Sequence, residues 1–493
     1  ASRWRIARQL LTESILLSLI GGVLGVLVAW WGTKALVALS PPALIDLQRV
    51  SVNLPVLGFT LALSLITGIV FGLAPALEAT RFDLQGALKE GGKNIGGAAG
   101  SSYLRNVFVV TQVALALVLL VGAGLLFRSF TRLQSVDPGF NAQNLLTVRV
   151  SLPFARYDTE QKRIDFFQQA ITQMKSLPGV QSVGAINTAP FTGLYSGTTV
   201  EIAGAPPLPP EQELKTGVCV TDANYFQTMQ IPLTRGRLYT QQETTEMRHV
   251  VVVNETFVKK NFDGQDPLGK RLVIYMKQEN VPTEVIGVVA DHKHLGLDVA
   301  VEPMVYWPHA ELPFGAMTLM LRTTNDPNAV APAARGVIRA VDPLQPIGEI
   351  STMESLLSVS VSRARFSASL LTVFSIVALV MAAVGIYGVM SYSVLQRTHE
   401  IGVRMALGAQ RFDVLKLVVK KGIALGVVGV VVGLAVSFLV TRLIATLLFE
   451  VTATDKATFA VVSIGLFLVT LLACYVPARR ATKVDPMKAL RYE

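Results

Sequence analysis

The chain has 493 residues, of which 51% are hydrophobic and 16% charged, and its formal net charge is +10 at pH 7. Its mean hydropathy of +0.48 is too high for a soluble protein of this length, so the composition predicts an integral membrane protein. The chain has only two cysteines, Cys219 and Cys474, and no disulfide framework is expected.

Six long uncharged runs predict membrane-spanning helices. Each has at least 20 residues, which is enough for a helix to cross roughly 30 Å of hydrocarbon. In chain order they are residues 14–33, 50–77, 106–127, 366–396, 422–441 and 457–478. The alternative, a set of buried core helices, is disfavoured because core helices are usually shorter and carry a polar face.

The positive charge predicts the topology, because Lys and Arg resist translocation across the membrane. Residues 1–14, 78–105, 395–421 and 478–493 together hold 18 Lys and Arg against 8 Asp and Glu, which accounts for the entire net charge. We therefore expect these four segments in the cytoplasm and the other loops outside. The basic excess therefore indicates topology, and we expect these segments to contact the surface of the lipid bilayer. No nucleic-acid partner is expected.

The long segment between the third and fourth spans, residues 128–365, has an ordinary soluble composition and predicts an outer domain. Each of its ends reads as strand, amphipathic helix and strand. These elements are residues 144–150, 159–177 and 180–186, and then 318–322, 328–341 and 346–350. Two β-α-β units around an insertion indicate a ferredoxin-like split unit. The middle, residues 191–313, predicts a β-rich subdomain.

The first part of the chain repeats in the last part. Residues 75–88 and 477–490 both read P-A-x-x-A-T-x-x-D-x-x-x-A-L. Upstream of this motif the matching positions are 408 residues apart, and they include Gly21 and Gly25, which match Gly429 and Gly433. The repeat predicts two copies of one membrane module. The recurring small-xxx-small pairs predict close helix packing.

The repeat also predicts the domain boundaries. We expect the end of the first module, a glycine-rich cytoplasmic linker, the first helix of the second module, the outer domain, and the rest of the second module. These are residues 1–90, 91–105, 106–127, 128–365 and 366–493. Because Ala1 corresponds to Ala409 and no initiating Met precedes it, the chain is expected to be an N-terminally truncated fragment. The expected fold class is an α-helical membrane protein with six spans and a large α+β extracytoplasmic domain.

Several motifs carry a family resemblance. Residues 397–409, R-T-H-E-I-G-V-R-M-A-L-G-A, resemble the cytoplasmic signature of the MacB/FtsX-like ABC permeases, and residues 486–493 resemble their C-terminal ending. Residues 266–270 and 287–291 resemble their extracytoplasmic domain. Two fused modules are similar to the duplicated MacB-like permeases. The resemblance places the protein in a bacterial inner membrane with its large domain in the periplasm.

The resemblance implies that a separate ATPase subunit, acting as a dimer, docks on the cytoplasmic segment 397–416. A periplasmic adaptor or an outer-membrane component is a further partner that it suggests. Glu400 and Arg404 have the i,i+4 spacing of an ion pair or an intersubunit contact. The residues expected to couple the ATPase to the membrane helices are Glu400, Ile401, Gly402, Arg404, Met405, Gly408 and Ala409. Without the resemblance, the same segment reads as a basic anchor with no partner.

The expected function is that of a permease subunit that transmits ATP-driven motion to the outer domain for export or extraction of a substrate. An FtsX-like signalling scaffold, which regulates an external partner without transport, is the alternative. A stand-alone sensor with no ATPase partner is the third reading. The large outer domain favours export, and the identity of the substrate stays open.

Three candidate chemical sites are weak. Residues 264–271 fit G-x-x-x-x-G-K, but Arg271 replaces the Ser or Thr that would hold magnesium, and no strand immediately precedes them. The chain is therefore expected to be non-catalytic and to need no cofactor.

His292 and His294, next to Asp291, offer too few ligands for a metal and are expected to be surface polar residues on one strand face. Cys219 is expected outside and Cys474 within the last span.

Overall fold

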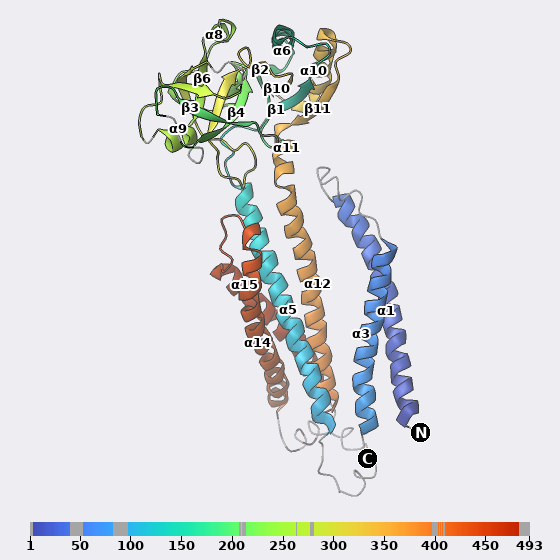
Figure 1. The fold of residues 1–493 in the computed structure, drawn as a ribbon. Helices are drawn as coiled ribbons and strands as arrows, with labels where there is room; N and C mark the ends of the chain where they lie inside the picture. Colours follow the sequence, from blue (N-terminus) through green and yellow to red (C-terminus); the bar gives the residue numbers. More distant parts are fainter. Residues whose placement is uncertain are drawn as a thin grey trace. The chain divides into compact units, whose positions relative to one another are not determined.

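The computed structural model describes residues 3–39, 53–81, 97–206, 209, 213–262, 264–276, 281–396, 403, 405, 407 and 410–482. The chain divides into two compact units. The membrane unit comprises Ala1–Arg132 and Arg363–Glu493, and the outer unit comprises Leu133–Ser362 (Figure 1).

The membrane unit contains long helices of apolar sequence. They are α1 (Arg3–Leu39), α3 (Leu54–Arg81), α5 (Gly97–Gln134), α12 (Ser362–Gln396), α14 (Arg411–Leu443) and α15 (Lys456–Ala481). Among the residues whose side chains the structure describes, α1, α5, α12, α14 and α15 each contain a stretch that is long and apolar enough to cross a membrane. The span expected at 50–77 falls on α3, of which the part Leu54–Ile69 is described in this way and is apolar, so a sixth span stays a prediction.

One boundary differs from the sequence-based expectation. The segment 91–105 was predicted to be a flexible linker, but α5 already begins at Gly97. Once the following apolar run has formed a helix, each further residue costs little to add, because nucleation is the expensive step of helix formation. Residues 97–105 contain no proline, so the helix extends backward through them.

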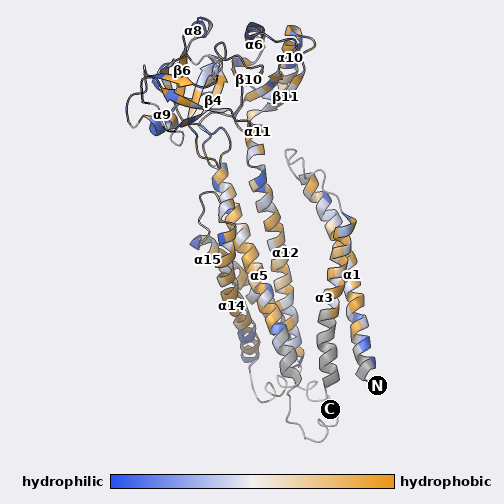
Figure 2. Cartoon of the chain, viewed as in Figure 1, coloured by the Kyte–Doolittle hydropathy of each residue, from blue (hydrophilic) through white to orange (hydrophobic). Residues whose placement is uncertain are grey.

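The helices α5, α12, α14 and α15 share one hydrophobic core. Hydrophobic residues run along much of these helices (Figure 2). Half of the α5 span is buried, compared with 17–22% of the spans of the other three helices. Val113, Leu117 and Leu125 of α5 are fully buried in this core. α5 is therefore the central helix of the group.

The first half of the outer unit is a four-stranded antiparallel sheet in the order β11-β1-β10-β2. The strands are β1 (Leu145–Ser151), β2 (Val180–Ile186), β10 (Ala316–Thr323) and β11 (Ile347–Thr352). Helix α6 (Glu160–Lys175) joins β1 to β2, and α10 (Pro327–Val341) joins β10 to β11. In each case another strand lies between the two that are joined, which is a split β-α-β arrangement. Both helices share a core with one face of this sheet.

The second half of the outer unit is a closed ring of strands in the order β4-β3-β7-β8-β6-β9, with β9 pairing back to β4. The ring strands are β3 (Gly197–Ile202), β4 (Leu214–Thr221), β6 (Val250–Asn254), β7 (Arg271–Ile274), β8 (Thr283–Val289) and β9 (Met304–Pro308). β5 (Leu233–Gly236) pairs with β8. Valines, Phe257 and Trp307 fill the ring. The region expected to be β-rich, 191–313, contains all of these strands.

Short helices and one strand pairing complete the outer unit. The helices are α7 (Tyr225–Met229), α8 (Gln241–Thr245), α9 (Glu255–Asn261) and α11 (Met353–Ser360). The pairing of Ile186 on β2 with Thr221 on β4 connects the two halves into one sheet. α7 packs against β2 so closely that a Cβ at Gly184 would lie 2.7 Å from the Cα of Tyr225. A glycine is therefore required at this position.

Candidate coupling site and helix-packing surfaces

The predicted coupling segment is described only in part. Glu400, Ile401, Gly402, Arg404, Gly408 and Ala409 lie outside the described residues. Met405 is described, and its partly buried side chain packs against a small hydrophobic cluster. Leu407, two residues later, is 83% exposed. The segment therefore has one side chain that points into the membrane unit and one that is accessible to a partner.

The cluster under Met405 joins three helix ends. It consists of Val394 near the end of α12, Val418 near the start of α14 and Ala478 near the end of α15. Close to this cluster, the Arg480 guanidinium donates a hydrogen bond of 2.8 Å to the Tyr387 hydroxyl, which links α15 to α12. Met405 therefore packs at a point where the ends of all three helices meet.

Glycines on α14 form two close-packing surfaces. A Cβ at Gly426 would lie 2.5 Å from Cγ2 of Thr470, so this glycine faces α15. A Cβ at Gly429 would lie 2.7 Å from Cβ of Val113, and one at Gly433 would lie 3.0 Å from Cα of Ala114. Gly429 and Gly433 thus let the α5 backbone approach α14 directly.

Gly21 and Gly25, the corresponding glycines of α1, have a different environment. Other glycines, Gly22 of α1 and Gly68 of α3, pack at the contact between these two helices. At the same contact the Ser64 hydroxyl donates a hydrogen bond of 3.0 Å to the Ser18 carbonyl. Within the part of the chain that the structure describes, no heavy atom comes within 4 Å of a Cβ built at Gly21 or Gly25.

Polar contacts fasten the outer end of α5 to the connection between α14 and α15. Arg128 pairs with Asp455, and Arg132 donates to the carbonyl of Glu450. The Ser129 hydroxyl accepts a hydrogen bond of 2.8 Å from the Phe449 amide. These contacts were not predicted from the sequence. Their one signal was a basic residue directly after an apolar run and an acidic residue two positions before another.

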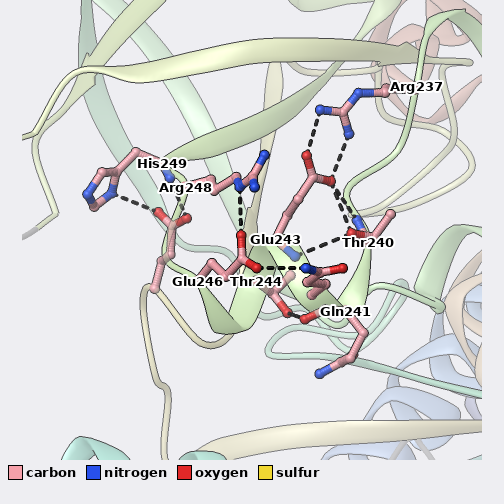
Figure 3. Close-up of polar contacts among 10 residues, drawn as sticks. Arg237, Thr240, Gln241, Glu243, Thr244, Glu246, Arg248 and His249 are labelled. Carbon is pink, nitrogen blue, oxygen red and sulfur yellow. Dashed lines mark hydrogen bonds and ion pairs between the residues drawn. The ribbon is translucent and has the colours of Figure 1, made fainter.

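A polar network surrounds α8 in the outer unit (Figure 3). The Arg237 guanidinium donates two hydrogen bonds, of 2.6 and 2.7 Å, to the Glu243 carboxylate. Thr240 forms a capping box with the same glutamate. The hydrogen bond from Arg237 is the main reason that the pKa of Glu243 falls to about 2. Glu311 accepts hydrogen bonds from the His249 amide and from the Trp307 indole. The network holds the segment that contains α8 against the strand ring.

The segment 264–271 lies between helix α9 and strand β7, with positive φ angles at Gly264 and Gly269. This order, helix then loop then strand, is the reverse of the strand-loop-helix order of a phosphate-binding loop. Leu268 instead packs against the core of the strand ring. The segment is a turn that covers one end of the ring.

His292 and His294 are buried, so the expectation of surface residues on a strand face was wrong. They lie in a loop, with their ring centroids 6.4 Å apart, and are 4% and 8% exposed. Burial lowers the pKa of His292 to about 3 and that of His294 to about 4. Aromatic neighbours such as Phe140 and Tyr306 favour this burial. Among the described residues, no group of three potential metal ligands occurs.

Cys219 lies in the outer unit and is fully buried, and burial raises the pKa of its thiol to about 12. Its nearest polar neighbour is Thr188, whose hydroxyl is 3.7 Å from the sulfur. Cys474 is fully buried in the core of the helix group. Both thiols are therefore shielded in the folded chain.

A cavity of about 320 Å³ lies in the outer unit, between α6, α8 and the loop that follows β4. Its one buried carboxylate belongs to Asp222, which accepts hydrogen bonds from the amides of Ala185 and Asn224. These bonds hold the loop in place, and they occupy both oxygens of the carboxylate. The cavity is lined by residues of both halves of the outer unit.

Family models match most of the chain. The model of the FtsX-like permease C-terminal domain matches residues 1–84 and again residues 372–486. The model of the MacB-like periplasmic core domain matches residues 109–337. The first model therefore matches the two parts of the chain that carry the internal repeat, and the second matches most of the segment between them.

Curated relatives show the same similarity at low identity. The pyoverdine export ATP-binding/permease protein PvdT of Pseudomonas aeruginosa is 26% identical over 273 residues, which is 52% of this chain and 40% of that protein. The macrolide export ATP-binding/permease protein MacB 2 of Aeromonas hydrophila is 24% identical over 60% of this chain and 46% of that protein. The chain thus spans less than half the length of these relatives.

Two solved structures are similar to parts of the chain. The periplasmic region of MacB from Actinobacillus actinomycetemcomitans has 16% identity and a TM-score of 0.32, and covers 46% of this chain and 95% of that one. The extracellular domain of the noncanonic ABC-type transporter YknZ from Gram-positive bacteria has 14% identity and a TM-score of 0.29, and covers 41% of this chain and 100% of that one.

Proposed function

This chain belongs to the MacB/FtsX-like ABC transporter permeases, and we propose that it transmits the motion of a separate ATPase dimer to its outer domain. The motion would drive export or extraction of a substrate on the outer side of the membrane. The relatives are named as export ATP-binding/permease proteins, and those names motivate the proposed partner and the proposed activity.

The observation that carries the proposal is the position of Met405. Its side chain packs where α12, α14 and α15 meet, at the end of these helices that the charge distribution assigns to the cytoplasm. Helix α12 then runs without interruption over 35 residues, from Gln396 back to Ser362 at the boundary of the outer unit. At about 1.5 Å per residue this is a rigid rod of roughly 50 Å, longer than the hydrocarbon thickness.

Further contacts support transmission through α5. The hydroxyl of Ser375 on α12 donates a hydrogen bond of 2.8 Å to the Leu119 carbonyl on α5. The ion pair of Arg128 with Asp455 ties the outer end of α5 to the start of α15. Both helices that lead to the outer unit, α5 and α12, are thus fastened to the pair α14 and α15. A shift at Met405 would move them together.

The proposal includes the finer features that the sequence predicts. The ATPase would contact Glu400, Ile401, Gly402, Arg404, Gly408 and Ala409, and Met405 would carry the motion to the helix ends. The membrane would be the bacterial inner membrane, crossed by six spans, and the outer domain would combine a ferredoxin-like half with the strand ring in the periplasm. A periplasmic adaptor or an outer-membrane component would complete the export path. Like other permease components of the family, the chain itself would be non-catalytic.

The decisive experiment measures how the permease stimulates the ATPase of its partner in membranes, together with co-purification of the two. Replacing Glu400 and Arg404 together by alanine should abolish both stimulation and co-purification. Met405→Ala should keep co-purification but reduce stimulation, because it removes only the contact with the helix ends. Lys483→Ala, in the cytoplasmic tail, is the control and should leave both readouts unchanged.

Full stimulation and full co-purification by the Glu400/Arg404 double variant would refute the assignment of the coupling segment. The FtsX-like scaffold is distinguished by a second readout. In that case the Met405→Ala variant would lose control over an external partner, while reconstituted vesicles with the unmodified chain would move no substrate.

A further inference from the structure

The cavity of the outer unit, about 320 Å³ in volume, has the size of a pocket for a small organic molecule. Its apolar floor consists of Phe167 on α6, Ala185 on β2 and Met317 on β10, which are buried residues of the core of the split β-α-β half. The loop after β4 and helix α8 add walls with polar side chains. An apolar floor with polar walls suits a ligand that has an apolar body and a polar head.

The wall formed by α8 is already in place in this structure. Gln241 and Thr244 are the residues of α8 that line the cavity, and Figure 3 shows them beside the capping box of Thr240 and Glu243. The two hydrogen bonds from Arg237 hold Glu243 in this arrangement. A wall that is fixed in advance spares a ligand the entropic cost of ordering it.

Several polar groups of the lining can only accept a hydrogen bond from a ligand. The hydroxyls of Thr172 and Thr244 each donate to a backbone carbonyl of their own helix, which leaves their oxygen lone pairs for a ligand. The Nε2 of His309 donates to the Phe314 carbonyl at 3.0 Å, and burial lowers the pKa of this histidine, so its Nδ1 is an acceptor. These groups favour a ligand that brings hydrogen-bond donors.

Asp222 adds an acceptor that carries charge. Its Oδ1 accepts one hydrogen bond, from the Ala185 amide, and its Oδ2 accepts two, from the amide and the side chain of Asn224. A carboxylate has about four acceptor positions, so Oδ1 can take a further donor. The residue keeps partial exposure and lines the cavity. Burial is the main cause that raises the pKa of this carboxyl, and a cation beside it would counteract that effect.

We propose that this cavity binds a small organic ammonium ion, whose ammonium group donates to Asp222 while its apolar body packs on the apolar floor. A charge-assisted hydrogen bond of this kind is stronger than one between neutral groups. The competing charge is that of Lys175 in the last turn of α6, which also lines the cavity. Its side chain is exposed, so solvent and salt screen its repulsion. The proposal concerns the outer unit alone and does not depend on coupling to an ATPase.

The test is isothermal titration of the full chain in nanodiscs of uncharged lipid, with empty nanodiscs as the blank. The probe is phenethylamine, which is protonated at neutral pH. Phenethyl alcohol is its neutral counterpart, and hydrocinnamate is an anion of similar shape. We expect saturable binding of the amine, with the alcohol at least tenfold weaker because it lacks the charge, and no binding of the anion.

Asp222→Asn should weaken binding of the amine at least tenfold and leave that of the alcohol nearly unchanged. The matched control is Asp326→Asn, because Asp326 accepts hydrogen bonds from the amide and the side chain of Asn328 in the same Asp-x-Asn pattern but lies outside the cavity lining. It should bind the amine like the unmodified chain. Lys175→Met should bind the amine at least as tightly, because it removes a like charge.

Ala223→Leu keeps the test decisive if Asp222→Asn disturbs the fold. Ala223 lines the cavity, so the larger side chain should fill part of it and weaken binding of amine and alcohol alike. No saturable binding of the amine, or equal affinities for amine and alcohol, would overturn the proposal. So would full binding by the folded Ala223→Leu variant, or weaker binding by Lys175→Met, which would indicate an anionic ligand. Loss of ATPase stimulation with amine binding intact would refute only the coupling proposal.

Discussion

Gly433 on α14 lies directly against Ala114 on α5, where a Cβ would be only 3.0 Å from the Ala114 Cα. Gly433→Leu should therefore force α14 away from α5 and break the shared core. Overpacking of this kind costs about 1–3 kcal/mol. The measurement is the thermal unfolding midpoint of the purified chain in detergent, which we expect to fall. Gly465→Leu on α15, where no described atom lies within 4 Å of the Cβ position, should leave the midpoint unchanged.

Arg322 is a buried cation that is held by three backbone carbonyls. Its guanidinium donates to the carbonyls of Thr228, Asn141 and Gln143 at 2.7 to 2.8 Å and is 5% exposed. Arg322→Met would leave these acceptors buried without donors, at a cost of about 1–3 kcal/mol for each that water does not reach. Hydrogen exchange of the outer unit should rise sharply. The exposed Arg335→Met on α10 is the control and should exchange like the unmodified chain.

Acid should destabilise the outer unit in two steps. The pKa values of His292 and His294 are lowered to about 3 and about 4 in the folded chain, so the folded state binds fewer protons than the unfolded state. The stabilising contribution is complete above the unfolded pKa near 6.5 and is lost as the pH falls toward 4. In that window each histidine changes the free energy of unfolding by about 1.4 kcal/mol per pH unit at most.

Glu243 contributes the second step, below its unfolded pKa of 4.5, since its folded pKa is about 2. Denaturant midpoints of the outer unit measured between pH 7.5 and 3 should show both steps. His294→Gln should flatten the slope between pH 6.5 and 4 and leave the lower step in place. Burial also lowers the pKa of His309, so this histidine contributes to the same window. A slope in the upper window that survives replacement of His292, His294 and His309 together would contradict the assignment.

Cys219 should react with an impermeant maleimide only after unfolding, because it is fully buried and burial raises its pKa to about 12. The topology is better tested with two exposed positions. Phe154→Cys in the outer unit should be labelled from outside in intact cells, whereas Leu407→Cys in the coupling segment should be labelled only after permeabilisation. Labelling of Leu407→Cys in intact cells would invert the predicted orientation.

The local elements of the fold could be predicted from the sequence because their signals lie within short windows. The hydrophobic length of the spans and the strand-like composition of β1 and β2 depend only on neighbouring residues. Likewise, α6 begins after Thr159, whose side chain caps it. The start of α5 was missed, because helix propagation out of a membrane span does not need a favourable local composition.

Long-range pairing could not be predicted. The closure of the strand ring depends on β4 meeting β9 across more than 80 residues of chain, and neither strand carries a sign of its partner. The burial of His292 and His294 likewise depends on aromatic side chains from other segments. Most of the candidate coupling residues lie outside the described residues, so their assignment continues to rest on the sequence motif.

The sequence by itself determined that the chain lies in a membrane, that it contains two related modules, and which glycines recur between them. Periodicity, hydrophobic length and repetition are properties of the chain read in one dimension. Only the tertiary structure decided which neighbour each glycine serves, with Gly426 against α15 and Gly433 against α5, while Gly21 and Gly25 have no neighbour within 4 Å of the Cβ position among the described residues. The physical reason is that a glycine permits a close approach but does not specify the helix that makes it; that choice depends on the packing of side chains from distant parts of the chain.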